Sequence, residues 1–450
     1  MPIKDMLKIT PPGSKSIANR ALILAALTKN KTTLKNIPKC DDTAHLIKGL
    51  KKFGIKTARP IKSNKPINIY TGNAGTATRF LTALATLTEK NIIITGDKRI
   101  QQRPIAPLTK ALNQLGAKVS DKNGYPPITI YPQKPEGGII TIPGNISSQF
   151  ISALLIIAPF LEKKTIINID QKLYSQPYVQ TTIKVMQSFN LKIMNKNFRQ
   201  FIINPQKTNP PKNYTIEGDA SSASYIGAYA ALHPDKKISI KNIHKNSIQG
   251  DILFLNLLEK MGCKISHEKH GITIVGPKKL KSLGRIDMNK TPDLVMTFAV
   301  LALFTTGITT ITNIANLRIK ETDRIAALKT ELTKLNAKVE TGKDFISITP
   351  PKALLKEALK IDAMQGSKLF MPEPYLLIRR ARNCAADEAV RDFHSFPKKS
   401  VTIETYNDHR IAMSFGILAD ILPNLQIKNP GCVSKSYTNF WKDLARLKKS

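Results

Sequence analysis

The 450-residue sequence predicts an α/β protein with many short strands, built from six copies of one repeated unit. Three observations carry this prediction. Apolar runs rich in Ile, Val and Thr alternate with segments of helical pattern, turns of small residues mark the junctions, and most of these turns recur about every 70 residues. Because 42% of the residues are hydrophobic, the chain can build a sizeable core, and its length suggests two domains.

At each junction an apolar run stops at a turn, and a helix of small and apolar residues begins at once. The six turns are Pro12-Gly13-Ser14-Lys15-Ser16, Gly72-Asn73-Ala74-Gly75-Thr76, Gly144-Asn145-Ile146-Ser147-Ser148, Gly218-Asp219-Ala220-Ser221-Ser222, Thr291-Pro292-Asp293 and Tyr406-Asn407-Asp408-His409. Measured from Gly13, the intervals are 59, 72, 74, 73 and 115 residues. Four similar intervals predict a repeated αβ unit, with strands between the turns such as Ile92–Thr95, Ile139–Ile142 and Ile308–Ile311.

The last interval is about 40 residues longer than the others, and the composition changes inside it. Four of the 15 arginines lie there within 13 residues, namely Arg379, Arg380, Arg382 and Arg391. We therefore interpret residues 361–400 as an insertion into the sixth unit, placed on the surface and without a catalytic duty.

The charge excess does not by itself indicate a nucleic-acid-binding protein. The chain carries 69 Lys+Arg against 32 Asp+Glu, a net charge of +37, but the lysines are scattered along its length. The sequence shows no recognition-helix pattern, no aromatic RNA-binding strand and no basic tail. Nucleic-acid binding is therefore the less favoured alternative, and no nucleic-acid partner is expected.

Neither a membrane span nor a disulfide framework is expected. The longest apolar stretches, Ile151–Leu161 and Val295–Phe304, fall short of the roughly 20 residues that a span needs, so both predict buried helices. The N-terminus lacks the pattern of a signal peptide. The four cysteines (Cys40, Cys263, Cys384 and Cys432) are too widely spaced for a disulfide scaffold or a zinc site, which favours a cytoplasmic protein without a metal.

Cations flank several of the small-residue turns. Lys15 and Arg20 flank the first, Arg79 follows the second, and Arg410 adjoins the sixth. For any single turn, residues such as Ser and Asp are first of all helix caps. A helix N-terminus also binds anions, because free N–H groups and the positive end of the helix dipole face outward. Several such helix starts together with Lys and Arg predict a site for a polyanionic ligand.

Eight segments form an ordered series that covers nearly the whole chain except the insertion. They are Pro12–Ala21, Gly72–Arg79, Arg103-Pro104-Ile105, Ser147–Phe150, Glu217–Ala223, Gln249-Gly250-Asp251, Arg318–Arg324 and Tyr406–Arg410. In identity and order these segments closely resemble the 3-phosphoshikimate 1-carboxyvinyltransferase (EPSP synthase) family. The resemblance implies a two-domain enolpyruvyl transferase-like fold, in which each domain contains three βαβαββ units around a pseudo-threefold axis.

The resemblance also implies where the chain passes between domains. The crossings are expected near Ser14 and Glu217, so one domain comprises residues 14–216 and the other residues 1–13 and 217–450. The first domain is the side of 3-phosphoshikimate, and the substrate cleft lies between the domains.

The reaction that the resemblance implies moves the carboxyvinyl group of phosphoenolpyruvate (PEP) to the 5-hydroxyl of 3-phosphoshikimate and releases phosphate, in chorismate and aromatic amino-acid biosynthesis. A C–O bond of PEP breaks rather than a P–O bond, so neither a metal nor a cofactor is expected. The tetrahedral intermediate requires an acid/base pair. By resemblance Asp293 accepts the hydroxyl proton, Glu321 delivers and removes the C3 proton, and Lys15 serves the PEP phosphate and proton transfer. From sequence alone, Asp293 could instead cap a helix, and Glu321 could pair with Arg324.

The two substrates together carry two phosphates and two carboxylates, and burying them requires several cations. Carried over by position, the residues expected to hold PEP are Lys15, Gly75, Arg103, Gln149, Arg324, Arg410 and Lys435. Those expected to hold 3-phosphoshikimate are Lys15, Ser16, Arg20, Ser147, Ser148, Gln149, Ser175, Asp293, Asn316 and Lys320. His409, between Asp408 and Arg410, is expected near the site in a supporting role.

Two rival functions are less favoured. The related enolpyruvyl transferases that act on UDP-N-acetylglucosamine use a loop cysteine, and the corresponding stretch here, Gly96–Arg103, has none. A nonenzymatic polyanion binder would gain nothing from Asp293 and Glu321 in its cleft. His267 and His270 have a spacing that a metal could use, but the strand pattern after them favours an exposed hairpin. We expect a monomer that takes only the two small-molecule substrates.

Overall fold

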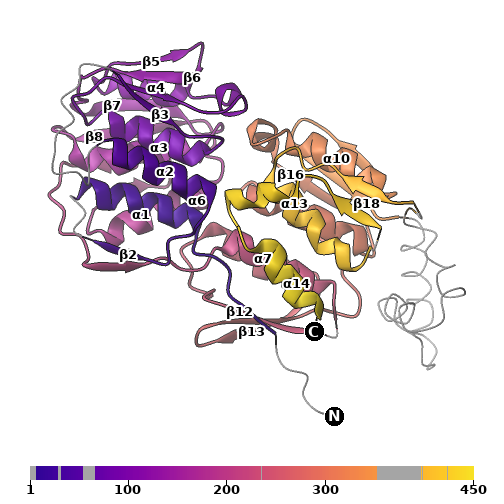
Figure 1. The fold of residues 1–450 in the computed structure, drawn as a ribbon. Coiled ribbons are helices and arrows are strands. Elements are labelled where there is room, and N and C mark those ends of the chain that lie inside the picture. The colour runs from indigo at the N-terminus through magenta and orange to yellow at the C-terminus, as the bar shows by residue number, and fades with distance from the viewer. Residues whose placement is uncertain are drawn as a thin grey trace, which may run out of the picture.

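The computed structural model describes residues 7–28, 32–53, 66–234, 236–351, 397, 399–422 and 424–449. Two lobes lie side by side in Figure 1, and each has a hydrophobic core of its own. The core of the first, the N-lobe, runs from Ile17 to Ile216. The core of the second, the C-lobe, contains Ile9 and residues between Ala223 and Leu447. The predicted α/β class with many short strands is confirmed.

Two four-stranded sheets of one design belong to the N-lobe. In each sheet the first two strands are parallel and the remaining neighbours are antiparallel, which gives the orders β3-β4-β6-β5 and β7-β8-β10-β9. The first unit comprises β3 (Ile67–Tyr70), α3 (Gly75–Ala85), β4 (Ile92–Thr95), α4 (Ala106–Gln114), β5 (Val119–Lys122) and β6 (Tyr125–Ile130). The second comprises β7 (Gly138–Pro143), α5 (Ser148–Ile157), β8 (Thr165–Asp170), α6 (Gln176–Ser188), β9 (Met194–Lys196) and β10 (Gln200–Ile203).

The C-lobe repeats the same design twice, with the strand orders β1-β12-β14-β13 and β15-β16-β18-β17. One unit comprises β1 (Leu7–Ile9), α7 (Ala220–Ala231), β12 (Lys237–Lys241), α8 (Phe254–Lys260), β13 (Lys264–Glu268) and β14 (Gly271–Val275). The other comprises β15 (Arg285–Asp287), α9 (Val295–Leu301), β16 (Thr309–Thr312), α10 (Arg324–Lys334), β17 (Lys338–Thr341) and β18 (Phe345–Thr349). The β13–β14 pair places His267 and His270 on an exposed hairpin, which confirms that expectation.

Each lobe has a third, smaller sheet, for which the described residues supply only two parallel strands. In the N-lobe, β11 (Asn213–Thr215) pairs with β2 (Thr33–Lys35), and the helices of this unit are α1 (Lys15–Leu27) and α2 (Asp41–Lys52). In the C-lobe, β19 (Val401–Ile403) pairs with β20 (Leu425–Ile427), and the helices are α13 (His409–Gly416) and α14 (Phe440–Lys449). Four of the six units are therefore complete within the described residues, and two show only their parallel strand pair and helices.

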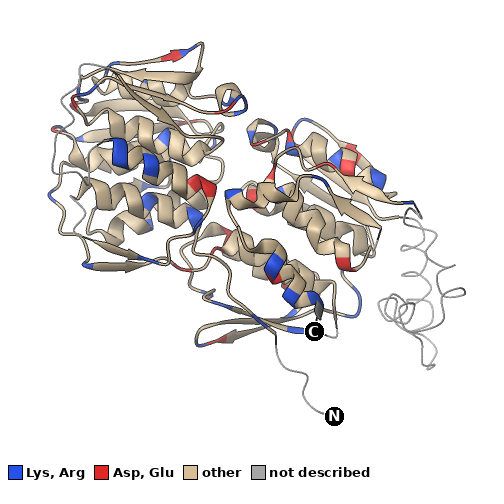
Figure 2. Ribbon diagram, viewed as in Figure 1, with Lys and Arg blue, Asp and Glu red and all other residues tan. Residues whose placement is uncertain are grey.

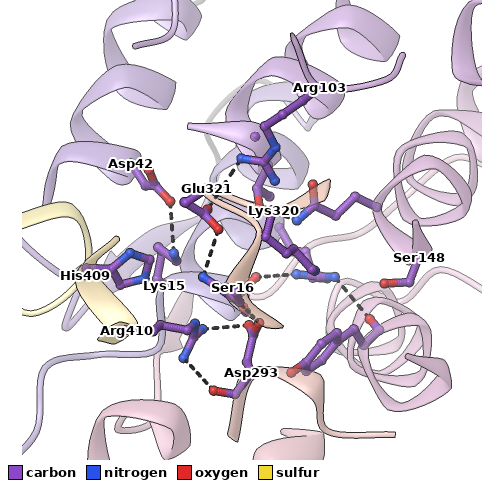
Figure 3. A pocket seen from close by; sticks show the side chains of 16 residues that line it. Lys15, Ser16, Asp42, Arg103, Ser148, Asp293, Lys320, Glu321, His409 and Arg410 are labelled. Atoms are coloured by element: carbon purple, nitrogen blue, oxygen red, sulfur yellow. Dashed lines mark hydrogen bonds and ion pairs between the residues drawn. The ribbon is translucent and has the colours of Figure 1, made fainter. Parts of the chain in front are cut away.

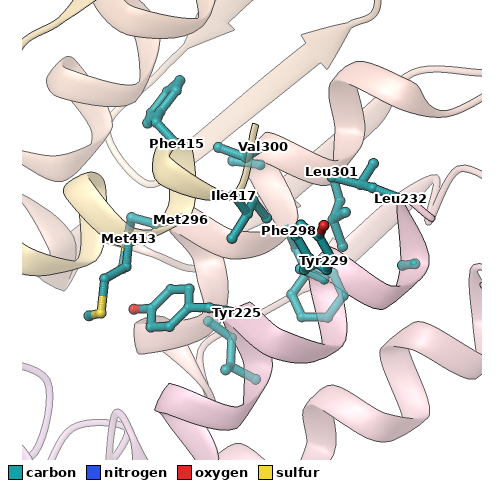
Figure 4. Packing of buried hydrophobic residues seen from close by; sticks show 14 of the residues in the cluster. Tyr225, Tyr229, Leu232, Met296, Phe298, Val300, Leu301, Met413, Phe415 and Ile417 are labelled. Atoms are coloured by element: carbon teal, nitrogen blue, oxygen red, sulfur yellow. The ribbon is translucent and has the colours of Figure 1, made fainter. Parts of the chain in front are cut away.

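The first helix of each unit packs in the middle of its lobe. Helices α1, α3 and α5 contact one another in the N-lobe, and α9 contacts α7 and α13 in the C-lobe. Figure 4 shows Tyr225 and Tyr229 of α7, Phe298 of α9 and Phe415 of α13 in the C-lobe core. Every residue of α9 is buried, as the apolar stretch around it predicts. These inner helices are therefore held by apolar contacts on all sides, which fixes where their first turns lie.

All six small-residue turns lead directly into helices, as predicted. Side chains cap several of these helix starts: Ser14 accepts a hydrogen bond from Ile17 N at 3.4 Å, and Asp219 accepts one from Ser222 N at 2.7 Å. One start differs from the expectation. The turn at Thr291 leads first into a 3₁₀ helix, η4 (Pro292–Leu294), and only then into α9.

The chain passes between the lobes at two neighbouring points. Gly13 and Gly218 form an antiparallel bridge there, and Ser14 N donates to Glu217 O at 2.8 Å. A Cβ atom on Gly13 would lie well inside contact distance of the Asn36 carbonyl oxygen, and one on Gly218 would lie 2.5 Å from Asn242 O. The two crossings are therefore packed too closely for side chains at these glycines.

The predicted insertion at residues 361–400 lies outside the described residues except for 397, 399 and 400. The described elements on either side of it are β18, which ends at Thr349, and β19, which begins at Val401. These two strands belong to different sheets. The insertion and its arginine-rich segment stay predictions.

Cationic and acidic residues are spread over both lobes in Figure 2. No helix within the described ranges is long and apolar enough to cross a membrane. The other 3₁₀ helices of the described residues are η1 (Ile100–Gln102), η2 (Ala158–Phe160), η3 (Gly250–Leu253), η5 (Ala302–Phe304), η6 (Ala315–Ile319), η8 (Ile417–Asp420) and η9 (Pro430–Lys435).

The close packing of the crossings predicts that Gly13→Ala lowers the free energy of unfolding by about 1–3 kcal/mol, because the added methyl group has to displace backbone. Gly431→Ala is the matched control, since a Cβ atom there meets nothing within 4 Å. Urea unfolding of both variants measures the difference. Equal midpoints for the two variants would show that the crossing has room to relax.

Candidate active site

A pocket between the lobes collects charged and hydroxyl side chains from both (Figure 3). Its empty space of roughly 640 Å³ includes open solvent, so the pocket can be reached from outside. Its lining consists of Lys15, Ser16, Arg20, Asp42, Gly75, Thr76, Arg103, Ser148, Gln149, Tyr178, Asp293, Lys320, Glu321, Arg324, His409 and Arg410. Six cations face three carboxylates in this lining, so the pocket is suited to anionic ligands.

The first turns of the inner helices supply much of this lining. Lys15 and Ser16 begin α1, Gly75 and Thr76 begin α3, Ser148 and Gln149 begin α5, and His409 and Arg410 begin α13. Because apolar packing holds α1, α3 and α5 side by side, their free N–H groups gather at one place, and the start of α13 lines the same pocket from the C-lobe. The predicted convergence of helix starts with cations is confirmed.

The guanidinium of Arg324 is the centre of the charged network. Its side chain is 1% exposed, and it donates from Nε to Asp408 Oδ2 at 2.7 Å, from Nη2 to Glu321 Oε2 at 2.8 Å and from Nη1 to Asp293 Oδ1 at 3.2 Å. The i,i+3 pair of Glu321 and Arg324 expected from the sequence is thus present. The same guanidinium places the side chains of Asp293 and Glu321 next to each other in the pocket.

Asp293 does not act as a helix cap, which was the alternative from the sequence. It lies inside η4, and no side chain caps either η4 or α9. Its carboxylate instead accepts from Arg410 Nη2 at 2.6 Å as well as from Arg324. At 21% exposure it is the more open of the two candidate catalytic carboxylates, because Glu321 is 10% exposed.

Asp42 joins two lysines from opposite lobes. Its Oδ2 lies 2.9 Å from Lys15 Nζ, and its Oδ1 lies 2.7 Å from Lys435 Nζ of η9. Lys435 Nζ also donates to the Asn73 carbonyl at 2.5 Å. Lys435 is not in the pocket lining, but these contacts place its ammonium group directly behind Asp42, which is.

Arg103 lies on the N-lobe side of Glu321, with Nη1 3.4 Å from Glu321 Oε1. The backbone of Gly75 is packed against this cation: a Cβ atom there would lie 2.8 Å from Arg103 Cζ. Gln149 Nε2 donates to Thr76 Oγ1 at 3.1 Å in the same region. The absence of a side chain at Gly75 thus leaves space for the arginine beside the start of α3.

The hydroxyl-rich part of the pocket surrounds Arg20. Its guanidinium is 3% exposed and donates to Thr182 Oγ1 at 2.6 Å and to the Ser16 carbonyl at 2.7 Å. Ser147 is the N-cap of α5 and accepts from Gln149 N at 3.3 Å, so it lies behind the lining residue Ser148. The capping function expected for it is confirmed.

Ser175 and Asn316 meet across the two lobes, with Asn316 Nδ2 donating to Ser175 Oγ at 3.3 Å. Both side chains are buried, and neither is in the pocket lining. All other residues predicted for the site, apart from Ser147 and Lys435, do line it. The structure therefore brings the predicted set together at one interface between the lobes.

The cations hold the pocket carboxylates in their ionised form. Burial alone would raise the pKa of Asp293, but Arg410, Lys320 and Arg324 together lower it below its usual value. Burial likewise opposes ionisation of Glu321, and Arg103 and Arg324 hold its pKa well below the usual range. Lys15 and Lys435 overcome burial at Asp42 and lower its pKa.

The pKa values of two basic groups are lowered, which favours their neutral forms. Burial, reinforced by Arg324, lowers the pKa of Lys320 to about 8. Burial and the nearby charges of Lys15 and Arg410 hold the pKa of His409 well below its usual value, so the imidazole is neutral. Its ring nitrogens make no hydrogen bond within the described part of the chain. His409 lies at the pocket as expected, next to the first turn of α13.

Sequence analysis missed three pocket residues, Asp42, Thr76 and Tyr178, and a contact beside the pocket. That contact is made by Arg99, which donates from Nε and Nη2 to the Lys320 carbonyl at 3.0 and 2.7 Å. Asp42, in the first turn of α2, has the pattern of an ordinary acidic helix start. Only its contact with Lys435, far along the chain, distinguishes Asp42 from such a helix start.

Among the described residues, no group of three or more His, Cys, Asp or Glu side chains could hold a metal ion.

Comparisons with known proteins give one consistent result. The model of the EPSP synthase (3-phosphoshikimate 1-carboxyvinyltransferase) family matches residues 6–365 and 384–444. The 3-phosphoshikimate 1-carboxyvinyltransferases of Colwellia psychrerythraea and Tolumonas auensis are 39% and 38% identical over 97% of this chain and 95% of each relative. An EPSP synthase structure from Acinetobacter baumannii has a similar fold, with a TM-score of 0.71 at 19% identity over 98% of this chain and 95% of that one.

The buried network predicts that Asp408→Asn lowers the free energy of unfolding by about 3 kcal/mol, because it removes a fully buried partner of the Arg324 cation. Glu136→Gln is the control. Its ion pair with Lys163 is shorter, at 2.5 Å, but both side chains are exposed, so no measurable change is expected. Denaturant titration of the two variants is the measurement, and an equal effect of both would contradict the central place of Arg324.

Proposed function

The chain belongs to the EPSP synthase family, and from that membership we propose which residues of the cleft perform the family's reaction. The protein transfers the carboxyvinyl group of PEP to the 5-hydroxyl of 3-phosphoshikimate, a step of the shikimate pathway to aromatic amino acids. One observation carries the proposal: Asp293 and Glu321 flank a single buried guanidinium, in a pocket rich in cations from both lobes.

PEP binds on the side of Glu321. The proposed contacts are Lys15, Gly75, Arg103, Gln149, Arg324, Arg410 and Lys435. Arg103, Arg324 and Lys435 are cations that lower the pKa of Glu321, and guanidinium groups match planar carboxylate and phosphate oxygens. Gly75 lets the Arg103 guanidinium lie against the first turn of α3, where a phosphate oxygen of PEP would meet both the cation and the helix start.

3-Phosphoshikimate binds against α1, α5 and α6. The proposed contacts are Lys15, Ser16, Arg20, Ser147, Ser148, Gln149, Ser175, Asp293, Asn316 and Lys320. The buried guanidinium of Arg20 donates to hydroxyl and carbonyl oxygens and, within the described residues, to no carboxylate, which suits a phosphate nearby. Asn316 and Lys320 come from the C-lobe, so this substrate contacts both lobes.

In the addition step, the 5-hydroxyl attacks C2 of PEP while C3 gains a proton. Asp293 accepts the hydroxyl proton, since Arg410 and Arg324 keep it ionised and its side chain is the more open one. Glu321 delivers the proton to C3. In the elimination step, phosphate leaves C2 with its C–O bond electrons, and Glu321 takes a proton back from the methyl group. Lys15 stabilises the departing phosphate and assists proton transfer.

The electrostatics of the cleft indicate that PEP binding raises the pKa of Glu321. A carboxylate whose pKa is held far below its usual range cannot donate a proton near neutral pH. When the anionic groups of PEP pair with Arg103, Arg324 and Lys435, those cations no longer stabilise the charge on Glu321. Its pKa then rises, and the carboxyl group becomes able to carry the C3 proton.

We also propose that residues 14–216 and residues 1–13 with 217–450 are two domains that move relative to each other at the Gly13 and Gly218 crossings. Separate apolar cores and few backbone links support this division. A monomer in the cytosol is proposed for the whole protein, because all residues of the pocket come from one chain and the cysteines are few and widely spaced.

Replacing either proposed catalytic carboxylate should slow turnover by about 10²–10⁴-fold. Glu321→Gln and Asp293→Asn preserve side-chain shape, so 3-phosphoshikimate should still bind. Phosphate release from PEP, measured with both substrates saturating, tests this, with Glu268→Gln of the exposed hairpin as the control. Near-normal turnover of Glu321→Gln would remove Glu321 from the mechanism.

The lowered pKa of Lys320 predicts a pH dependence of 3-phosphoshikimate binding. The ammonium form is present below about pH 8 and is lost above it, so affinity should fall up to about tenfold per pH unit as pH rises beyond 8. Lys320→Met should bind more weakly but with a flat profile over this range. Calorimetric titrations between about pH 7 and pH 9.5 make the comparison. A profile shared by both proteins would assign the titration to another group.

A further inference from the structure

We infer that Asp251, in η3 of the C-lobe, is a positioning residue. Its carboxylate fixes the phenol of Tyr178 in the N-lobe and thereby shapes the 3-phosphoshikimate side of the cleft. Asp251 belongs to the Gln249-Gly250-Asp251 segment, which the proposed mechanism does not use. The inference rests on the proposed placement of 3-phosphoshikimate against α6.

Asp251 joins elements of both lobes. Its side chain is 3% exposed, and Oδ1 accepts a hydrogen bond from Tyr178 Oη at 2.8 Å. Its Oδ2 accepts one from the hydroxyl of Ser221. Ser221 and Asp251 lie on α7 and η3 of the C-lobe, whereas Tyr178 lies on α6 of the N-lobe and lines the pocket. The hydrogen bond to Tyr178 therefore crosses the interface at the wall of the site.

The first turn of α6 is held by the C-lobe at further points beside this bond. Thr181 Oγ1 donates to the Ile248 carbonyl at 2.9 Å, just before the Asp251 segment. Gly250 packs so closely on Pro177 that a Cβ atom there would overlap the proline ring. With the Asn316 to Ser175 contact, these interactions connect the N-terminal half of α6 to the C-lobe, in addition to its packing on α1 and α5 of its own lobe.

The ionised carboxylate of Asp251 lowers the stability of the folded protein. Burial, together with the neighbouring charge of Asp293, raises the pKa of Asp251 to about 6, and Arg410 only partly offsets this. Because that pKa is higher in the folded protein than in the unfolded chain, the ionised form destabilises the fold at neutral pH. The hydrogen bonds that Asp251 accepts from Tyr178 and Ser221 come from hydroxyl groups rather than from cations. A buried carboxylate that accepts hydrogen bonds from two hydroxyl groups is suited to hold a neighbouring side chain in place.

The position of Tyr178 matters for one substrate more than for the other. Its backbone carbonyl accepts from Arg20 Nη2 at 3.1 Å, and Ser175 lies one turn earlier on the chain. Arg20 and Ser175 are both proposed contacts of 3-phosphoshikimate. Within the described part of the chain, the cations proposed to bind PEP but not 3-phosphoshikimate make no hydrogen bond to Tyr178 or Asp251. Loss of the Asp251 to Tyr178 bond should therefore weaken 3-phosphoshikimate binding selectively.

Steady-state kinetics on Tyr178→Phe, Asp251→Ala, their double variant and Asp251→Asn tests the inference. We expect each of the first two to raise KM for 3-phosphoshikimate about tenfold, with KM for PEP at saturating 3-phosphoshikimate changed less than about twofold. The double variant should be no worse than the worse single variant, because both remove one hydrogen bond. Asp251→Asn should recover most of the loss, since an amide oxygen still accepts from Tyr178 and Ser221 can donate or accept.

Tyr229→Phe is the matched control. Tyr229 is also a buried tyrosine that donates to an aspartate, Asp420, at 2.8 Å, but it lies in the C-lobe core away from the pocket. It should leave both KM values unchanged, although it can lower stability. If Asp251→Ala fails to fold, the contrast between Tyr178→Phe and Tyr229→Phe still decides the matter.

Three results would overturn the inference: effects of the single variants that multiply to about 100-fold in the double variant, an equal rise in both KM values, or Asp251→Asn as impaired as Asp251→Ala. Ser148→Ala separates this failure from a failure of the proposed site. If Ser148→Ala raises KM for 3-phosphoshikimate while Tyr178→Phe does not, only the function of Asp251 is wrong. If neither variant has an effect, the placement of 3-phosphoshikimate itself is wrong.

Discussion

The buried cation of Arg324 is the interaction on which the rest of the cleft depends. A guanidinium removed from water costs several kcal/mol unless carboxylates and hydrogen bonds compensate it. Here the compensation comes from three separate elements: Asp408 at the cap of α13, Glu321 before α10, and Asp293 in η4. Each element must therefore lie within hydrogen-bond distance of one side chain. This requirement fixes the C-lobe half of the site, and it fixes the two candidate catalytic carboxylates relative to each other.

The other half of the site becomes complete only where the lobes meet. Lys435 reaches Asp42, Glu321 reaches Arg103, and Asn316 reaches Ser175, each from the C-lobe to the N-lobe. The charges of the site are therefore assembled from both lobes. The crossings at Gly13 and Gly218 bring the backbones of the two lobes close together.

The surrounding charges explain why the pKa values of neighbouring carboxylates shift in opposite directions. Asp293 and Glu321 are surrounded by arginines, so both are kept ionised despite burial. Asp251 is more deeply buried, and it faces hydroxyl groups and the charge of Asp293, so its pKa rises. Groups with the same chemistry and pKa values pushed apart by their surroundings are a frequent arrangement in acid–base sites. In the mechanism that we propose, Asp293 and Glu321 transfer protons, and Asp251 holds a neighbouring side chain.

The sequence by itself determined the repeated units and the helix starts, because strand periodicity and turn chemistry are local. It placed the strand Ile92–Thr95 and the helix after Ser147 correctly. Most of the pocket lining, including Asp293 and Glu321, was expected only from the resemblance of its motifs to a known family. The sequence left open whether Asp293 caps a helix, and it gave no sign of Asp42 or Tyr178. Only the tertiary structure decided these points. Asp42 meets Lys435 across 393 residues, and Tyr178 meets Asp251 across 73, because the partner of a buried polar group depends on which elements pack together in space.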